Sequence, residues 1–551
     1  MSENILVATA WPYTNNYLHL GHIAGCYLPA DIFARYQRAR GNTVIMVSGS
    51  DQHGTPVTIA AEAEGVQPID IVNKYRKNHL EVWENLGISY DLFTTTGTQN
   101  HIDTVQDIFT KLYDKGLIYK KYMTLLYSKI DNRFLADRYV EGTCPDCKYE
   151  RARGDQCDQC GKPMDALELI NPISKLSGDT PIPKESEHFF LKLSDLEKPL
   201  LEWIKKNDYW KPNVKNFSLK YLTEGLKDRA ITRDIEWGIP IPLDGYETKR
   251  IYVWFEAVIG YLSASKEWAQ IQEKPKEWEK FWFNKNARSY YFLGKDNIPF
   301  HTIIWPGILL GYENHNLPYD VPANEYMNLS GGKFSKSENR AVWAHEFLEK
   351  FSADALRYYI VSNMPENSDS DFTWEEFLRR NNDELVATLG NLIHRILTFT
   401  FKNFDSQIPE CKELETSDKK LISEIFSTKE NVELNLDICK FRESMRQIMS
   451  LAQNTNRYLD SEAPWHTIKT DKERTGTIMW VALYSISAIK TFLSPFMPNA
   501  SEKLGDYLGI VSDIGKPTWD IVQPHSGTRL EPPLPLFKKL ELDIENPLAN
   551  E

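Results

Sequence analysis

The segment from the N-terminus to Asp51 restricts the fold of this chain more than any other. Residues 5–10 (ILVATA) form an apolar run bounded by Trp-Pro-Tyr, which is typical of a strand buried in a parallel sheet. A helix is predicted over residues 22–40, ended by Gly41, and residues 42–51 (NTVIMVSGSD) predict a second strand that ends at Asp51. This β-α-β unit predicts an α/β fold with a doubly wound, Rossmann-like parallel sheet.

The rest of the chain is predicted to form further domains. With 551 residues the chain is too long for one hydrophobic core. Clustered cysteines and a proline-rich segment indicate an insertion, strand-like runs return at 250–257 and 288–296, and apolar residues from Leu385 onward follow helical spacing. The predicted boundaries are 1–117 and 249–325 for the two halves of the Rossmann-like domain, 118–248 for an inserted connective domain with a zinc knuckle, 326–370 for a linker domain with the KFSKS loop, and 371–551 for a helical domain and C-terminal tail.

Charge and terminal sequence exclude some classes of protein. The net charge of −13 argues against binding to nucleic acid or membranes through total charge, although a local basic groove could still bind RNA. The N-terminus lacks the charged and apolar regions of a signal peptide, and the longest apolar-leaning run, 478–489, is too short to span a bilayer. Seven cysteines, four of them clustered, suit a reducing compartment. We therefore expect a cytoplasmic protein without a membrane partner.

The sequence HLGH directly follows the first predicted strand. His19 and His22 stand where a doubly wound sheet binds its ligand, and the N-terminus of the next helix offers free N–H groups to a phosphate. Gly21 allows a ligand to approach the backbone closely. The two imidazoles could donate hydrogen bonds to charge that develops on a phosphate.

A second cationic motif lies in residues 329–340 (LSGGKFSKSENR). Lys333 and Lys336 follow two glycines, and two ammonium groups on a glycine-rich loop suit a triphosphate or pyrophosphate. A solvated surface loop would have the same composition.

Four cysteines predict a metal site. Cys144 and Cys147 form one C-x-x-C pair, and Cys157 and Cys160 form a second pair after residues 148–156. Four thiolates at this spacing suit tetrahedral Zn²⁺, with a disulfide pair and an iron–sulfur cluster as the rival interpretations. Because no histidine or glutamate completes an open catalytic position, the zinc is expected to be structural.

HLGH and KFSKS, in this order, resemble the two signatures of class I aminoacyl-tRNA synthetases. The stretches ATAWPYTNNYLHLGH, GSDQHGTP, VWFEAVIGYL, GKDNIPFHTIIWP, LSGGKFSKS and EAPW are similar to the methionyl-tRNA synthetase family over nearly the whole chain. The resemblance implies ATP-dependent activation of L-methionine to methionyl-adenylate and transfer to the 3′ end of tRNA(Met), both elongator and initiator. Another class I aminoacyl-tRNA synthetase, a related nucleotidyltransferase, and a zinc-bearing RNA-binding protein without activity are the alternatives.

The resemblance also assigns roles to residues. It implies that Asp51 holds the methionine ammonium, that Gly294 and Asp296 contact ATP, that His19 and His22 stabilise the transition state, and that Lys333 and Lys336 bind the phosphates. The implied side-chain pocket consists of Tyr13, Trp254, Ala257, Tyr261 and His301. Mg²⁺ is expected to accompany ATP.

In the helical domain, the resemblance implies an anticodon reader. Asn391 and Arg395 stand four residues apart on one predicted helix, and Trp465 follows Pro464. Stacking on an unstacked base and hydrogen bonds to base edges are how proteins generally read single-stranded RNA loops. No segment after about residue 540 is long enough for the dimerisation domain that some members of the family append, so a monomer is expected.

Overall fold

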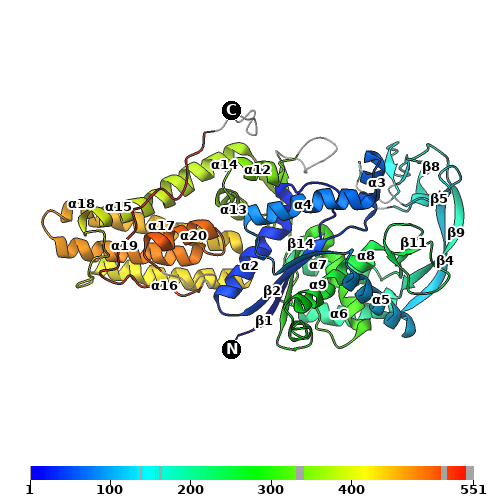
Figure 1. Cartoon of the computed structure of the whole chain (residues 1–551), viewed down its shortest axis with the longest axis horizontal. Coiled ribbons are helices and arrows are strands. Elements are labelled where there is room, and N and C mark those ends of the chain that lie inside the picture. The colour runs from blue at the N-terminus through cyan, green and yellow to red at the C-terminus, as the bar shows by residue number, and fades with distance from the viewer. Residues whose placement is uncertain are drawn as a thin grey trace.

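A five-stranded parallel sheet forms the centre of the molecule (Figure 1). The computed structural model describes residues 2–136, 139–154, 157, 159–160, 164–329, 341–510 and 518–541. The strand order is β15-β14-β1-β2-β3, and every neighbouring pair is parallel. The strands are β1 (Asn4–Thr9), β2 (Thr43–Ser50), β3 (Leu92–Thr95), β14 (Arg288–Gly294) and β15 (Ala323–Asn324). The predicted doubly wound, Rossmann-like fold is therefore confirmed.

Helices cover both faces of this sheet. In β1, Ile5 and Val7 belong to one hydrophobic core, whereas Leu6 and Ala8 belong to another. This alternation follows from the two-residue period of a strand, and it explains why the run is apolar throughout. The helices of this part are α1 (Leu20–His22), η1 (Ile23–Tyr27), α2 (Leu28–Ala39), α3 (Thr55–Glu64), α4 (Pro68–Leu86), α5 (Gln99–Asp114), α8 (Val253–Glu256), η4 (Ala257–Ile259), α9 (Gly260–Ile271), α10 (Glu279–Trp282), η5 (Lys295–Asn297), η6 (Phe300–Ile304) and α11 (Trp305–Tyr312).

The strand predicted over 250–257 is wrong in most of its length. Only Arg250–Ile251 is extended, as β13 in a small antiparallel sheet between β11 (Thr232–Arg233) and β12 (Ile239–Pro240). The helix α8 begins at Val253. A short apolar run fits a buried helix as well as a buried strand, so its periodicity alone could not decide between them.

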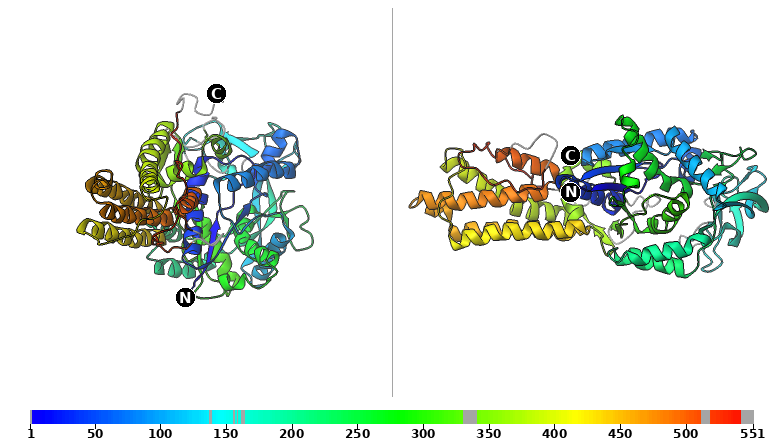
Figure 2. Two further views of the ribbon diagram at one scale, coloured as in Figure 1. Left: turned by 60° about the vertical axis from the view of Figure 1, so that its left-hand side comes forward. Right: turned by 90° about the horizontal axis from the view of Figure 1, so that it is seen from below.

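The inserted segment forms its own antiparallel sheets. The long strands β4 (Ile118–Ser128) and β9 (Ile182–Leu191) pair from Ile118 to Tyr127 of β4. The three-stranded sheet β7-β6-β8, which we call the cysteine-bearing sheet because the clustered cysteines lie next to its strands, is at the far end of the molecule (Figures 1 and 2). The other elements of the segment are β5 (Arg133–Phe134), β6 (Val140–Thr143), β7 (Ala152–Arg153), η3 (Ala166–Glu168), β8 (Ile170–Ser174), α6 (Leu193–Lys206), α7 (Pro212–Thr223) and β10 (Arg229–Ala230).

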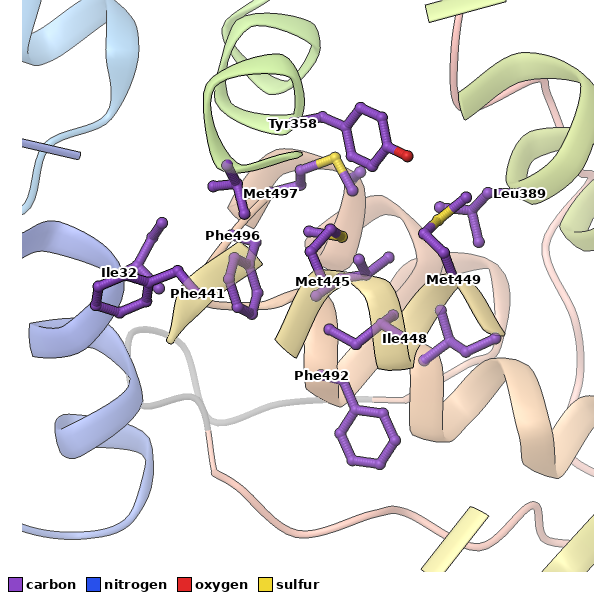
Figure 3. Packing of buried hydrophobic residues seen from close by; sticks show 14 of the residues in the cluster. Ile32, Tyr358, Leu389, Phe441, Met445, Ile448, Met449, Phe492, Phe496 and Met497 are labelled. Atoms are coloured by element: carbon purple, nitrogen blue, oxygen red, sulfur yellow. The ribbon is translucent and has the colours of Figure 1, made fainter. Parts of the chain in front are cut away.

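A helical bundle occupies the opposite end of the molecule (Figure 2). One hydrophobic core continues from α2 of the sheet domain into the bundle, through Ile32, Phe441, Phe496 and Met445 (Figure 3). The elements from the linker onward are β16 (Met327–Leu329), α12 (Ala344–Lys350), α13 (Ala353–Ser362), β17 (Ser370–Phe372), α14 (Trp374–Arg379), η7 (Arg380–Gly390), α15 (Asn391–Asn403), α16 (Thr416–Asp437), α17 (Phe441–Glu462), α18 (Pro464–Thr467), α19 (Lys472–Leu493) and α20 (Pro498–Tyr507). The predicted helical domain is confirmed.

The central bundle helix α19 is among the most apolar segments of the chain. By length and composition this 22-residue helix could cross a membrane, but 94% of its most apolar window is buried inside the structure. Its neighbours α16, α17 and α20 surround it. It therefore has the character of a core helix.

Candidate active site

A pocket of about 470 Å³ opens at the carboxyl ends of β1 and β14. The chain winds from β1 toward β3 on one side of the sheet and from β14 to β15 on the other, so this is the topological switch point where doubly wound folds bind ligands. This pocket is lined by five residues that the sequence analysis placed near the nucleotide: His19, Gly21, His22, Gly294 and Asp296. We refer to it as the nucleotide pocket.

The two signature histidines lie against each other at the entry to the first helix. Their rings are stacked with centroids 3.6 Å apart, and the backbone N–H of His19 donates to Nδ1 of His22 over 3.2 Å. Because Nδ1 of His22 accepts a hydrogen bond, its proton-bearing nitrogen is Nε2 in the neutral ring. The loop itself is fixed to the segment after residue 340, since Leu20 N donates to Val342 O and Ala344 N donates to Leu18 O.

A second, smaller pocket of about 80 Å³ adjoins the nucleotide pocket. The two pockets share Ala10, Trp11, Tyr13 and Asn297 in their walls. All six residues that the resemblance assigned to methionine line the smaller pocket, namely Tyr13, Asp51, Trp254, Ala257, Tyr261 and His301. We refer to it as the side-chain pocket.

Asp51 places a buried carboxylate in the side-chain pocket. The residue is 3% exposed, and Oδ1 accepts a 3.3 Å hydrogen bond from the backbone N–H of His53. Burial raises the pKa of Asp51 well above its ordinary value, the nearby carboxylate of Glu256 raises it further, and the hydrogen bond from His53 acts in the opposite direction. A cationic ligand would compensate this carboxylate, so the pocket is suited to an ammonium group.

His301 presents a neutral imidazole to the same pocket. Its Nδ1 lies 2.8 Å from Asn297 O and its Nε2 lies 2.6 Å from the Tyr261 hydroxyl. A carbonyl oxygen can only accept, so Nδ1 carries the proton and Nε2 accepts from Tyr261. Burial lowers the pKa of His301 to about 4, against a smaller opposite effect of the bond to Asn297. The wall is therefore uncharged at neutral pH and suits an apolar side chain.

Trp11 occupies a slot that two glycines leave open. A Cβ atom on Gly49 would lie 2.4 Å from the indole ring of Trp11, and a Cβ atom on Gly260 would lie 2.6 Å from it. Neither position therefore accepts a side chain without displacing the indole. The ring lies edge-on to Tyr261, and in this way Trp11 shapes the wall common to both pockets.

The four clustered cysteines meet in the inserted segment. Their sulfur atoms all lie within 4.8 Å of one another, with Sγ distances of 4.0 Å for Cys144–Cys160 and 3.5 Å for Cys147–Cys157. Four sulfurs bound tetrahedrally at about 2.3 Å from one Zn²⁺ lie about 3.8 Å apart, and the two distances bracket this value. None of the four forms a disulfide. The cluster can hold a metal ion.

The three proposed anticodon readers lie together on the bundle. Arg395 on α15 places its guanidinium 5.1 Å from the ring centre of Trp465 on α18, and its Nη2 lies 3.2 Å from Asp460 Oδ1. Asn391 begins the helix α15 four residues before Arg395, and it is exposed. Trp465 is 36% exposed. The arrangement offers an aromatic face and two polar side chains to an external ligand.

Several pocket residues were missed from the sequence. Phe300 packs edge-on against Trp254 with ring centres 5.2 Å apart and lines the side-chain pocket. Four consecutive residues after the short strand β15 line the nucleotide pocket: Glu325, Tyr326, Met327 and Asn328. Two-residue strands give no periodic signal, so the sequence did not reveal that this segment reaches the site. Lys333 and Lys336 lie outside the described residues.

The sheet, the paired histidines at its switch point and the adjoining carboxylate pocket define a class I aminoacyl-tRNA synthetase. The family model described as tRNA synthetases class I (M) matches residues 5–397, and the model of the anticodon binding domain of methionyl tRNA ligase matches residues 408–547.

Curated relatives specify the family further. The methionine–tRNA ligase of Dehalococcoides mccartyi (strain CBDB1) is 54% identical over 541 residues, which cover 98% of each chain. That of Thermomicrobium roseum is 48% identical and covers 99% of this chain and 98% of the relative. A solved structure of Mycobacterium tuberculosis methionyl-tRNA synthetase bound by methionyl-adenylate shares the fold, with a TM-score of 0.82 at 23% identity, over 98% of this chain and 100% of that one. The chain belongs to the methionine–tRNA ligase family.

Proposed function

We propose that this chain activates L-methionine with ATP and transfers the methionyl group to the 3′ end of tRNA(Met). The observation that carries the proposal is the common wall of the two pockets. Ala10, Trp11, Tyr13 and Asn297 border both, so a nucleotide in one and an amino acid in the other would meet along this wall. Holding the two reactants in contact converts their reaction into an effectively unimolecular one.

In the first step, the methionine carboxylate attacks the α-phosphorus of ATP and pyrophosphate leaves. Asp51 would bind the ammonium, and the thioether would pack against the rings of Tyr261, Trp254 and Tyr13. His19 and His22 would donate hydrogen bonds to the phosphate oxygens as charge develops there. Gly294 and Asp296 would contact ATP, Lys333 and Lys336 would bind its outer phosphates, and Mg²⁺ would accompany it.

In the second step, a terminal ribose hydroxyl of the tRNA attacks the acyl carbon and AMP leaves. Asn391, Arg395 and Trp465 would read the anticodon at the far end of the molecule (Figure 1). The aromatic ring beside a guanidinium supports base stacking, and the neighbouring amide supports hydrogen bonds to base edges. Both elongator and initiator tRNA(Met) would be substrates.

The four-cysteine cluster would hold one structural Zn²⁺. The sulfur distances fit a tetrahedral site, and two of the cysteines, Cys144 and Cys157, are fully buried in the small core of the inserted segment. A bound Zn²⁺ would neutralise thiolate charge and cross-link the two C-x-x-C pairs. A cytoplasmic monomer stays a prediction from the sequence.

The reaction is tested by amino-acid-dependent exchange of pyrophosphate into ATP. Methionine should be the amino acid that stimulates exchange, and His22→Ala should lower kcat by at least about 100-fold, as the loss of a transition-state donor does. Stimulation by leucine or isoleucine in place of methionine would assign the chain to another class I specificity, and the absence of any exchange would leave only an RNA-binding role.

The same preparation tests the tRNA step separately. Trp465→Ala should leave methionine-dependent exchange unchanged, because exchange needs no tRNA, and should lower kcat/KM for charging by roughly 10-fold or more, as the loss of one base stack costs about 1–3 kcal/mol. Equal charging by both proteins would refute the proposed anticodon site.

A further inference from the structure

A buried polar cluster lies behind the side-chain pocket without lining it. It consists of Glu256 on α8, His53 in the loop after β2, and His101 on α5. The side chain of Glu256 is 0% exposed, that of His101 1% and that of His53 8%. None of the three borders either pocket, so the roles proposed above do not explain why three ionisable groups are buried here.

The hydrogen bonds of the cluster define which group donates. Nδ1 of His53 lies 2.9 and 3.1 Å from the two oxygens of Glu256, so Nδ1 is the donor. Burial opposes ionisation of Glu256, but its interactions with His53 and His101 outweigh the effect of burial, and the pKa of Glu256 lies below its ordinary value. An ionised carboxylate therefore bridges the two imidazoles.

His101 approaches the same carboxylate from the opposite side. Its Nε2 lies 3.4 Å from Glu256 Oε2, an ion-pair contact without the geometry of a hydrogen bond, and its Nδ1 lies 2.8 Å from the Ser263 hydroxyl. The Ser263 hydroxyl donates to Gly260 O, so it accepts from His101. His101 thus joins Glu256 to α9, the helix that begins with Gly260 and carries Tyr261.

The cluster connects two segments, distant in sequence, that both line the side-chain pocket. The loop after β2 supplies Asp51, and its His53 both donates a backbone N–H to Asp51 and holds Glu256 through its ring. Glu256 stands between Trp254 and Ala257 on the wall that also contains Tyr261. The contact between His53 and Glu256 spans 203 positions of the chain. Within the described part of the chain, it is the only side-chain hydrogen-bonded contact between Gln52 or His53 and residues 253–261.

We propose that Glu256 is a positioning residue of the methionine site, whose carboxylate, held by His53 and His101, fixes the Asp51 loop at the correct distance from the helix that carries Trp254, Ala257 and Tyr261. The inference rests on the proposed function. Glu256 touches neither reactant in this scheme, and its effect passes through the two walls. A buried carboxylate can do this because its hydrogen bonds with His53 and its contact with His101 act in a low local dielectric, where polar interactions are strong and hold their surroundings in place.

The test compares methionine binding in Glu256→Ala and Glu256→Gln with the wild-type protein. Pyrophosphate exchange gives KM for methionine and for ATP, and calorimetric titration gives Kd for methionine alone. In Glu256→Ala the His53 ring loses its acceptor and His101 loses the carboxylate beside it, and we expect KM and Kd for methionine to rise by about 10- to 100-fold, the effect of a misplaced wall. KM for ATP should stay within about twofold. Glu256→Gln keeps an acceptor for His53 and should give a smaller rise.

A matched buried carboxylate separates positioning from general destabilisation. Asp418 in α16 is also fully buried and is bonded to Tyr458 and Arg474, and α16 belongs to the bundle, outside the sheet domain (Figure 1). Asp418→Asn should lower the thermal midpoint while KM for methionine stays within about twofold. Retention of wild-type KM and Kd for methionine by Glu256→Ala would overturn the proposal. If that variant does not fold, an unchanged Kd in Glu256→Gln overturns it.

This outcome differs from a failure of the proposed function. If another amino acid stimulates exchange in the wild-type protein, the methionine assignment fails, and the same variants measured with that amino acid decide the role of Glu256.

Discussion

At the scale of single residues, burial determines which ionisable side chains can carry charge in the pockets. Asp51 and His301 lie in the same small cavity, yet burial raises the pKa of the first and lowers that of the second. Both shifts favour the neutral form, because a charge is less well solvated in an apolar cavity. A ligand ammonium reverses this preference at Asp51 alone. The side-chain pocket can therefore bind a cation at one end and an apolar chain at the other.

The buried imidazole of His301 makes stability depend on pH. The pKa of His301 is about 4 in the folded protein and 6.5 in the unfolded chain. The contribution of the neutral ring to the free energy of unfolding is therefore present above pH 6.5 and is lost as pH falls toward 4. At pH 5 the loss amounts to about 2 kcal/mol relative to pH 7. The thermal midpoint of His301→Gln should therefore fall less between pH 7 and pH 5 than that of the wild-type protein. Both midpoints are measured by scanning fluorimetry at one heating rate. A parallel decline in both proteins would contradict the assignment.

At the scale of elements, the cysteine-bearing sheet has too small a core to be stable alone. Its strands β6, β7 and β8 are at most five residues long, and among the described residues its hydrophobic cluster has few buried side chains, which include Leu135, Val140 and Leu169 and two cysteines. Elements of this size generally need a metal or disulfides to fold. Since no disulfide is present among the described cysteines, the stability of this element should depend on the metal.

The metal dependence has a direct measurement. We expect about one zinc per chain by atomic absorption, and Cys157→Ser should lose it, because a four-thiolate site that lacks one ligand binds far more weakly. Limited proteolysis should then cut between β6 and β8, whereas α16–α20 stay intact. Cys411→Ser, at a partly exposed position outside the cluster, is the matched control and should keep the zinc. Full zinc content in Cys157→Ser would refute the four-cysteine site.

At the scale of the whole molecule, one buried guanidinium joins the sheet domain to the bundle. Arg357 on α13 is fully buried; it donates to Asp31 on α2 over 2.7 Å and to the carbonyl oxygens of Phe496, Pro495 and Leu86. The helical segment that contains Asp31 starts at the signature histidines. Ile32 and Tyr358, the residues that follow Asp31 and Arg357 in the chain, belong to the apolar core shown in Figure 3. The sheet domain and the bundle are thus joined by a buried ion pair and by hydrogen bonds from the same guanidinium.

Removal of this guanidinium should destabilise the connection between the domains. Arg357→Met removes the donor to three carbonyl groups and leaves Asp31 with Arg35 as its remaining cationic partner. We therefore expect the free energy of unfolding in urea to fall by about 3 kcal/mol. Arg446→Met removes an exposed pair with Glu443 and should cost less than about 1 kcal/mol. Equal costs for the two variants would show that Arg357 does not stabilise this junction.

The sequence by itself determined the features that are local. The first β-α-β unit, the histidine motif after β1 and the two C-x-x-C pairs each depend on residues close together in the chain, where periodicity and spacing act directly. The residues assigned to methionine, to the anticodon and, with Gly294 and Asp296, to ATP came from a resemblance, and the structure places them around two adjoining pockets or together on the bundle.

Only the tertiary structure decided the rest. Val253–Glu256 formed a helix where a strand was predicted, two glycines left room for Trp11, and His53 met Glu256 across 203 positions of the chain. Such contacts depend on how separate elements pack, and no short-range pattern encodes them. The physical reason is that propensity and periodicity act within a few residues, whereas side-chain packing and buried charge are settled by neighbours that are distant in sequence.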